Sequence, residues 1–141
     1  MRKGAVIAID HGSKKCGFAV TDPLRISLEL LPPYRGDENG LLARVAALAQ
    51  ERDVEAFVVG MPRNMDGTEG GRARDVRGFM ERLAARFPGV AIAEQDERLT
   101  TKAAEEILRE QGIRGPRARE LRDSVSALVL LRDWMAAGEP R

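Results

Sequence analysis

Short apolar runs alternate with polar turns over the first third of the chain. Residues 4–10 (GAVIAID) and 16–21 (CGFAVT) each predict a buried strand, and the tight turn HGSKK joins them. A third strand is expected at 26–32, where Pro32 and Pro33 would end it. Three successive strands with short connections predict an antiparallel meander.

The apolar period then changes to that of amphipathic helices. Leu42, Val45 and Leu48 fall on one helical face, with Asp37 or Asn39 as a candidate N-cap. Strands are expected at 54–60 and 90–95. Between these two strands lie a long polar loop and a helix whose apolar stripe is Val76, Met80, Leu83 and Phe87.

Two further helices are predicted after the last strand. The first runs over 100–111, with Thr100 or Thr101 as its cap and Gly112 as its stop. A basic linker at 113–119 leads to the second, which ends near Gly138. The order βββαβαβαα predicts an α/β fold with a mixed five-stranded sheet flanked by helices, because helices between later strands imply parallel crossovers. Residues 1–141 are expected to form one domain.

The amino-acid composition is that of a globular protein. Hydrophobic residues are 43% and charged residues 32% of the chain, as in ordinary globular proteins. The apolar stretch after Arg2 and Lys3 stops at Asp10 and is too short for a secretory signal, so a cytoplasmic location without membrane attachment is expected. The single cysteine, Cys16, fits a reducing compartment.

The chain has few histidine and cysteine side chains, which limits the kinds of metal site that it can form. With only Cys16 and His11 available, a zinc site of Cys/His type cannot be built, so a metal would have to be held by carboxylates. The net charge of +1 means that the chain as a whole is not basic, so the net charge does not indicate nucleic-acid binding.

Asp10 ends the first predicted strand. Because that strand is apolar on both faces, we expect it to be central and Asp10 to lie at the mouth of the sheet. Gly12 allows close backbone approach there, and Ser13 and Lys14 offer donors for a phosphate. The alternative is an aspartate that only caps its turn. His11 is expected to be a partly exposed turn residue and not a ligand or base.

The stretch DERLTT at 96–101 places two acids at the carboxyl end of a predicted strand, where ligands bind in open α/β sheets. Asp96 and Glu97 alternate in direction, so only one of them can point along the mouth of the sheet. The pattern does not choose between them, and both could instead be surface charges near a helix start.

A third candidate lies on the last helix. Asp123, Ala127 and Trp134 share one helical stripe, so Asp123 stands at the start of the face that packs on the sheet. A carboxylate there needs a partner. The competing interpretation is an N-cap aspartate.

Asp10, the 96–97 pair and Asp123 are distant in sequence, yet each lies at the end of an element that could meet the others. Clustered carboxylates repel unless a divalent cation lies among them, and oxygen ligands favour Mg²⁺ or Mn²⁺. Such a cluster suits hydrolysis of a phosphodiester bond. Basic residues near these acids are candidate phosphate contacts: Lys14, Arg63, Arg74 and Arg119.

Four blocks in order carry a family resemblance: AIDHGSKKCGFAVTD, VVGMPRNMDGTEGGRAR, DERLTT and RDSVSALVLL. They resemble the YqgF (RuvX) family of small bacterial proteins, described as pre-16S rRNA nucleases or Holliday-junction-resolvase-like proteins. The likeness spans residues 5–134. It implies a ribonuclease H-like fold with three antiparallel and two parallel strands. It also implies that Asp10, Glu97 and Asp123 are catalytic and hold Mg²⁺ or Mn²⁺, with Asp96 as a supporting group.

The resemblance further implies a nuclease that acts in maturation of the 5′ end of 16S rRNA during ribosome biogenesis. Its partners would be structured RNA, ribosome precursor particles and, alternatively, branched DNA. The chain departs from the usual pattern at His11, Lys15 and Cys16, and none of these positions is an acid. Two other hypotheses are an ATPase, whose superfold requires two such lobes, and a non-catalytic RNA-binding assembly factor.

Overall fold

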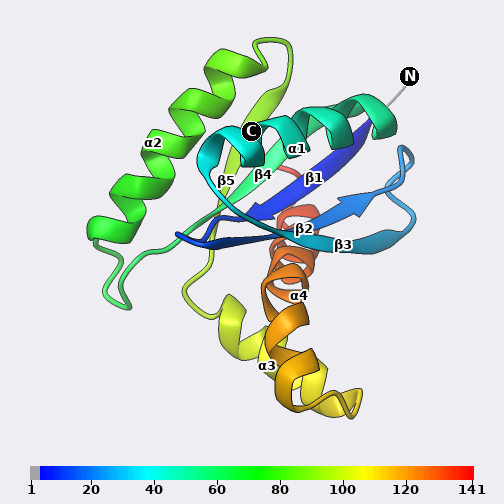
Figure 1. Ribbon diagram of the computed structural model, residues 1–141, viewed down its shortest axis with the longest axis vertical. Coiled ribbons are helices and arrows are strands. Elements are labelled where there is room, and N and C mark those ends of the chain that lie inside the picture. The colour runs from blue at the N-terminus through cyan, green and yellow to red at the C-terminus, as the bar shows by residue number, and fades with distance from the viewer. Residues whose placement is uncertain (1–3) are drawn as a thin grey trace.

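The computed structural model describes residues 4–141, and it contains five strands and four helices over this range (Figure 1). Arg2 and Lys3, which bear on the expected absence of a secretory signal, lie outside the described residues. The elements in chain order are β1 (Ala5–Asp10), β2 (Lys15–Thr21), β3 (Leu28–Arg35), α1 (Glu38–Arg52), β4 (Val54–Met61), α2 (Gly71–Arg86), β5 (Ala91–Asp96), α3 (Thr100–Glu110) and α4 (Gly115–Ala136).

The strands form one sheet in the order β3-β2-β1-β4-β5. The pairs β1/β2 and β2/β3 are antiparallel, while β1/β4 and β4/β5 are parallel. This is the mixed ribonuclease H-like sheet that was expected, with β1 at its centre. The carboxyl ends of β1, β4 and β5 therefore meet at one edge.

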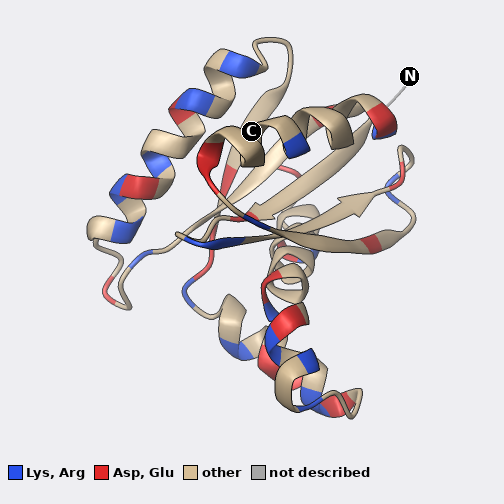
Figure 2. Cartoon of the chain, in the orientation of Figure 1, with Lys and Arg blue, Asp and Glu red and all other residues tan. Residues whose placement is uncertain are grey.

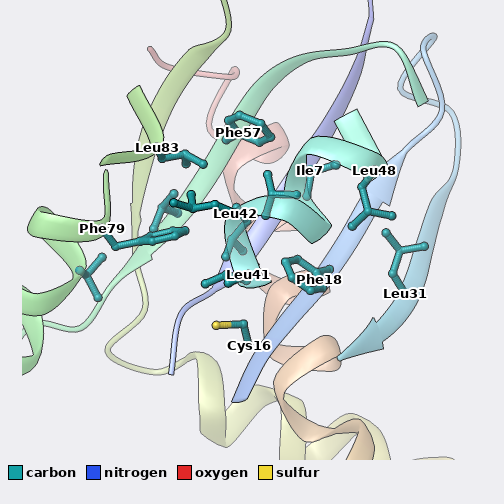
Figure 3. Close-up of a cluster of buried hydrophobic side chains, with 14 of the residues drawn as sticks. Ile7, Cys16, Phe18, Leu31, Leu41, Leu42, Leu48, Phe57, Phe79 and Leu83 are labelled. Atoms are coloured by element: carbon teal, nitrogen blue, oxygen red, sulfur yellow. The ribbon is translucent and has the colours of Figure 1, made fainter. Parts of the chain in front are cut away.

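The two faces of the sheet carry side chains of different size. One face bears large residues, including Ile7, Phe18 and Phe57, which pack against Leu42 and other residues of α1 and Phe79 of α2 (Figure 3). The opposite face bears small residues at corresponding positions, which are Ala8, Ala19, Ala56 and Ala93, and it is covered by α4. Small side chains let a helix approach a sheet closely, so α4 can lie near the strand backbones.

Pro32 and Pro33 lie inside β3 and do not end it, which corrects the expected boundary. Phe18 pairs with Leu31 and Cys16 pairs with Tyr34, so one extra residue of β3 is accommodated between these pairs. This is a β-bulge on an edge strand, and such a position tolerates prolines that cannot donate to the ladder.

Two expectations about the last helices are wrong. The basic segment expected to be a linker is mostly the first turn of α4, which begins at Gly115 with Pro116 in its first positions. Neither Thr100 nor Thr101 caps α3, because the N-cap residue is Leu99 and no side chain caps that end. Asp37 does cap α1, since its carboxylate accepts a hydrogen bond from the amide of Gly40 at 2.9 Å.

Helix α3 and the first half of α4 extend away from the sheet as a two-helix arm (Figure 1). A separate small cluster that includes Ala104, Leu108 and Val125 holds the arm together. From residue 4 to residue 141, none of the helices has the length and apolar character that crossing a bilayer requires.

Candidate functional site

Asp10 is the last residue of β1 and lies on the side of the sheet that α4 covers. Side chains alternate along a strand, and Val6 and Ala8 belong to the cluster under α4, so Asp10 points to the same side. Two glycines flank it on the neighbouring strands. Gly17 is its partner on β2, and Gly60 follows Val59, the partner of Ile9 on β4.

These two glycines make room for two other acids. A Cβ atom at Gly17 would lie 2.1 Å from the main-chain carbon and oxygen of Asp123, so α4 contacts the sheet backbone at this point. A Cβ atom at Gly60 would lie 2.8 Å from Oε2 of Glu97. The glycines thus allow Asp123 and Glu97 to approach Asp10 from opposite sides.

The carboxyl groups of Asp10 and Glu97 are hydrogen-bonded to each other, which requires one of them to be protonated. Burial raises the pKa of Asp10 above its usual value, with a further rise from the charge of Asp123. Burial, followed by the charge of Asp10 and the hydrogen bond to it, raises the pKa of Glu97 to about 9. Both shifts favour one proton shared within the pair over two charged carboxylates.

Asp123 lies inside α4, eight residues after its first residue, so the alternative that it is an N-cap is wrong. Its Oδ2 is 3.7 Å from Nζ of Lys15, and the same ammonium donates a hydrogen bond to the carbonyl oxygen of Arg119 at 2.7 Å. Asp123 is close enough to Asp10 for its charge to act on the Asp10 pKa. Lys15 thus neutralises the third acid of the group.

As the side chains stand, residues 4–141 contain no group of three or more histidine, cysteine or acidic side chains arranged to hold a metal ion. The donor chemistry nevertheless fits a hard divalent cation, because Asp10, Glu97 and Asp123 offer only carboxylate oxygens. A cation would replace the proton shared by Asp10 and Glu97 and would compete with Lys15 for Asp123. The residues fit Mg²⁺ or Mn²⁺ in chemistry, provided that Asp123 turns away from Lys15.

The side chains of Asp96 and His11 have partners outside this group. The carboxylate of Asp96 accepts hydrogen bonds from the amide and guanidinium of Arg98, at 2.9 and 2.8 Å. The imidazole of His11 stacks on Phe79 of α2, with ring centroids 4.5 Å apart. Of the two acids in DERLTT, it is Glu97 that meets Asp10.

The four cationic residues that were expected to contact phosphate occupy different surroundings. Lys14 lies exposed in the turn between β1 and β2, and Arg74 lies exposed on α2. Arg119 is exposed on the arm, and its carbonyl group binds Lys15. Arg63 is engaged elsewhere, since its guanidinium lies 2.6 Å from Glu94 and 3.5 Å from Glu69. Of these four residues only Arg119 is joined to the acid group, because its carbonyl oxygen accepts the hydrogen bond of Lys15.

Two cationic side chains at the site were not predicted from the sequence. Lys15 pairs with Asp123, and the charge of Arg72 acts on the pKa values of both Asp10 and Glu97. Arg72 also donates a hydrogen bond to the carbonyl oxygen of His11 at 2.5 Å. Its position in the first turn of α2, directly after a glycine-rich loop, was the available signal.

The proton shared by Asp10 and Glu97 predicts how stability depends on pH without divalent ions. The folded-state pKa of Glu97 lies above its usual value of 4.5, so between about pH 5 and about pH 9 the folded chain binds more protons than the unfolded chain. The free energy of unfolding should therefore fall as the pH rises through this window. Glu97→Gln should remove this loss and raise stability by about 1–2 kcal/mol near pH 8.5.

Thermal unfolding in a chelator at about pH 6 and about pH 8.5 checks this expectation. Glu94→Gln is a control on the preceding strand, because Glu94 is paired with arginines and its pKa is lowered. It should destabilise the protein at both pH values. An unchanged or lower stability of Glu97→Gln at the higher pH would contradict the shared proton.

Comparison with known proteins gives a consistent match over most of the chain. The RuvX family, described as Holliday junction resolvase, matches residues 4–137. A protein of Cereibacter sphaeroides named "Putative pre-16S rRNA nuclease" is 41% identical over 141 residues, covering 95% of this chain and 88% of its own. A protein of the same name from Symbiobacterium thermophilum is 40% identical, covering 94% of this chain and 92% of its own. Another, from Acetivibrio thermocellus, is 33% identical, covering 92% of this chain and 94% of its own.

Solved structures support the fold. Thermus thermophilus RuvC superposes with a TM-score of 0.61 at 16% identity, over 96% of this chain and 97% of that chain. The same protein bound to a Holliday junction substrate gives a TM-score of 0.60 at 17% identity. The family match and the relatives above 30% identity together show that this chain belongs to the RuvX family.

Proposed function

We propose that the protein is a divalent-metal-dependent nuclease that hydrolyses phosphodiester bonds. Asp10, Glu97 and Asp123 are proposed as its catalytic, metal-binding residues. The observation that carries this proposal is the convergence of three sequence-distant acids on one edge of the sheet, with two of them close enough to share a proton. An arrangement that costs stability without a cation is expected where a cation is needed for function.

The chain's own residues prepare the site for a phosphate. Asp10 and Glu97 must lose their shared proton to present two anionic ligands, and Lys15 must release Asp123. Lys15 and Arg72 place positive charge beside the acids, which offsets the charge of a phosphate bound there. Mg²⁺ or Mn²⁺, when bound, would activate water and stabilise the leaving oxygen.

The proposed substrate is the precursor of 16S rRNA near its 5′ end, as structured RNA in the cytoplasm or within ribosome precursor particles. The shared name of the relatives supports this choice. Branched DNA is the second candidate, supported by the family description and by the fold of RuvC. A purely binding role is disfavoured, because buried repelling carboxylates weaken the attraction for a phosphate backbone.

A cleavage assay separates these functions. The purified protein is incubated with an RNA that spans the 5′ flank of 16S rRNA and with a four-way DNA junction, each with Mn²⁺ or with a chelator. We expect Mn²⁺-dependent cleavage of the RNA and a slower reaction, or none, on the junction. Faster cleavage of the junction would favour the resolvase, and cleavage undiminished by the chelator would contradict the metal-dependent mechanism.

A further inference from the structure

A groove on the two-helix arm is lined by four arginines. It has a volume of about 340 Å³ and runs between α3 and the first half of α4. Leu108, Ile113 and Ala118 form its apolar lining, and a single acid, Glu105, is among its lining residues. The four arginines are Arg109, Arg114, Arg119 and Arg122.

These arginines differ from most others in the protein. Arg63, Arg77 and Arg82 each pair with glutamates within the fold. Over the part of the chain that the structure describes, Arg109, Arg114 and Arg119 have no carboxylate within ion-pair distance, and Arg122 has only Glu105 at 4.0 Å. All four residues are exposed. Figure 2 shows basic and acidic residues interspersed along both helices of the arm. The groove therefore keeps cationic groups available for an external anion.

Two interactions connect residues of the groove with the acids. Arg122 lies close enough to Asp10 for its charge to lower the pKa of that carboxyl, and Lys15 joins Asp123 to the backbone of Arg119. A nucleic-acid strand that binds at the acids is thus expected to extend toward the groove.

The acids themselves supply little attraction for a polyanion. Asp10, Glu97 and Asp123 bring three carboxyl groups together there, and Lys15 is already used by Asp123. Affinity for a nucleic acid must therefore come from cations nearby, and the four arginines of the groove are suited to it. Guanidinium groups bind phosphate oxygens in a bidentate manner, and the apolar lining accommodates sugar carbons.

We propose that this groove binds the sugar–phosphate backbone of the nucleic-acid segment that flanks the scissile bond. The proposal rests on the proposed nuclease function, and it adds where the substrate strand runs and what holds it. Recognition through phosphates predicts binding that depends on salt and not on base sequence.

The test uses full-length protein with Asp10→Asn, so that binding is measured without cleavage. The double substitution Arg109→Gln and Arg114→Gln is compared with Arg86→Gln, an exposed arginine at the end of α2 that also has no ion pair with any of residues 4–141. Arg114 makes no side-chain capping hydrogen bond, so the double variant should fold normally. Fluorescence anisotropy gives the Kd for a labelled RNA hairpin with a single-stranded flank over a range of salt concentrations.

We expect the double variant to bind more weakly to flanks of every sequence and to reduce the slope of log K against log salt by about 2, or about 1 for each arginine. Arg86→Gln should leave the slope unchanged. A double-variant slope and Kd equal to those of the parent would overturn the proposal. The proposal would also be overturned if the protein bound polyglutamate as tightly as RNA and if the double substitution at Arg109 and Arg114 weakened both interactions equally. If the parent binds no nucleic acid at all, the proposed nuclease function itself fails.

Discussion

Asp10→Asn should reduce the rate of RNA cleavage by about 10³-fold at saturating Mn²⁺, equivalent to a loss of about 4 kcal/mol of transition-state stabilisation. Asparagine keeps the shape of the side chain but removes the charge that would bind a cation. The same change should leave the Tm unchanged or raise it, because burial already disfavours the charged form of Asp10. The two measurements together separate catalysis from folding.

Asp133→Asn is the matched control for this experiment. Asp133 is a half-buried aspartate on α4 whose carboxylate pairs with the adjacent Arg132 at 3.3 Å, apart from the acid group. It should cleave RNA at the parent rate. Cleavage by Asp10→Asn within a few-fold of the parent would show that Asp10 is not a catalytic residue.

Gly17→Ala should lower the free energy of unfolding by about 3 kcal/mol or more and should also lower the cleavage rate. The added methyl group would lie 2.1 Å from main-chain atoms of Asp123. Because those atoms belong to α4 and not to a flexible side chain, relief requires the helix to move away from β2. That movement separates Asp123 from Asp10, so stability and activity fall together.

Gly89→Ala provides the comparison, since a Cβ atom at Gly89 meets nothing within 4 Å. Its Tm should stay within a few degrees of the parent, whereas Gly17→Ala should unfold about 10 °C lower. Thermal unfolding followed by circular dichroism measures both variants. An unchanged Tm for Gly17→Ala would mean that α4 does not contact the sheet backbone at this point.

The central position of β1 and the place of Asp10 at the mouth of the sheet follow from the sequence pattern. Residues 4–10 are apolar at every position up to Asp10, which is typical of a central strand covered on both faces, and β1 is central. Alternation along β1 then sets the direction of Asp10. Such local periodicity reports on burial, which is why it predicts this part of the fold well.

Other features depend on contacts between segments that are distant in the sequence. Pro32 and Pro33 are ordinary strand breakers, yet the bulge opposite Gly17 accommodates them in β3. Asp123 could be interpreted as a helix cap because aspartate is common at that position, but α4 begins eight residues earlier, at Gly115. Tertiary packing determines the conformation of these segments, and local propensity could not predict it.

At the site, too, some features follow from the local residue pattern and others depend on contacts between distant segments. The residue pattern left Asp96 and Glu97 equally suitable, and only the family resemblance favoured Glu97. The roles of Gly17 and Gly60 could not be predicted, because a glycine in a strand reveals nothing of the helix or carboxylate that passes over it. Lys15 was likewise missed, since its partner Asp123 lies 108 residues later in the sequence.

The most direct test of the three-acid site is anomalous diffraction from a crystal soaked in Mn²⁺ at a concentration that supports cleavage. We expect an anomalous peak in contact with carboxylate oxygens of Asp10, Glu97 and Asp123, with the Asp123 side chain turned away from Lys15. A crystal with no peak among these carboxylates, or with manganese bound only elsewhere on the protein, would contradict it.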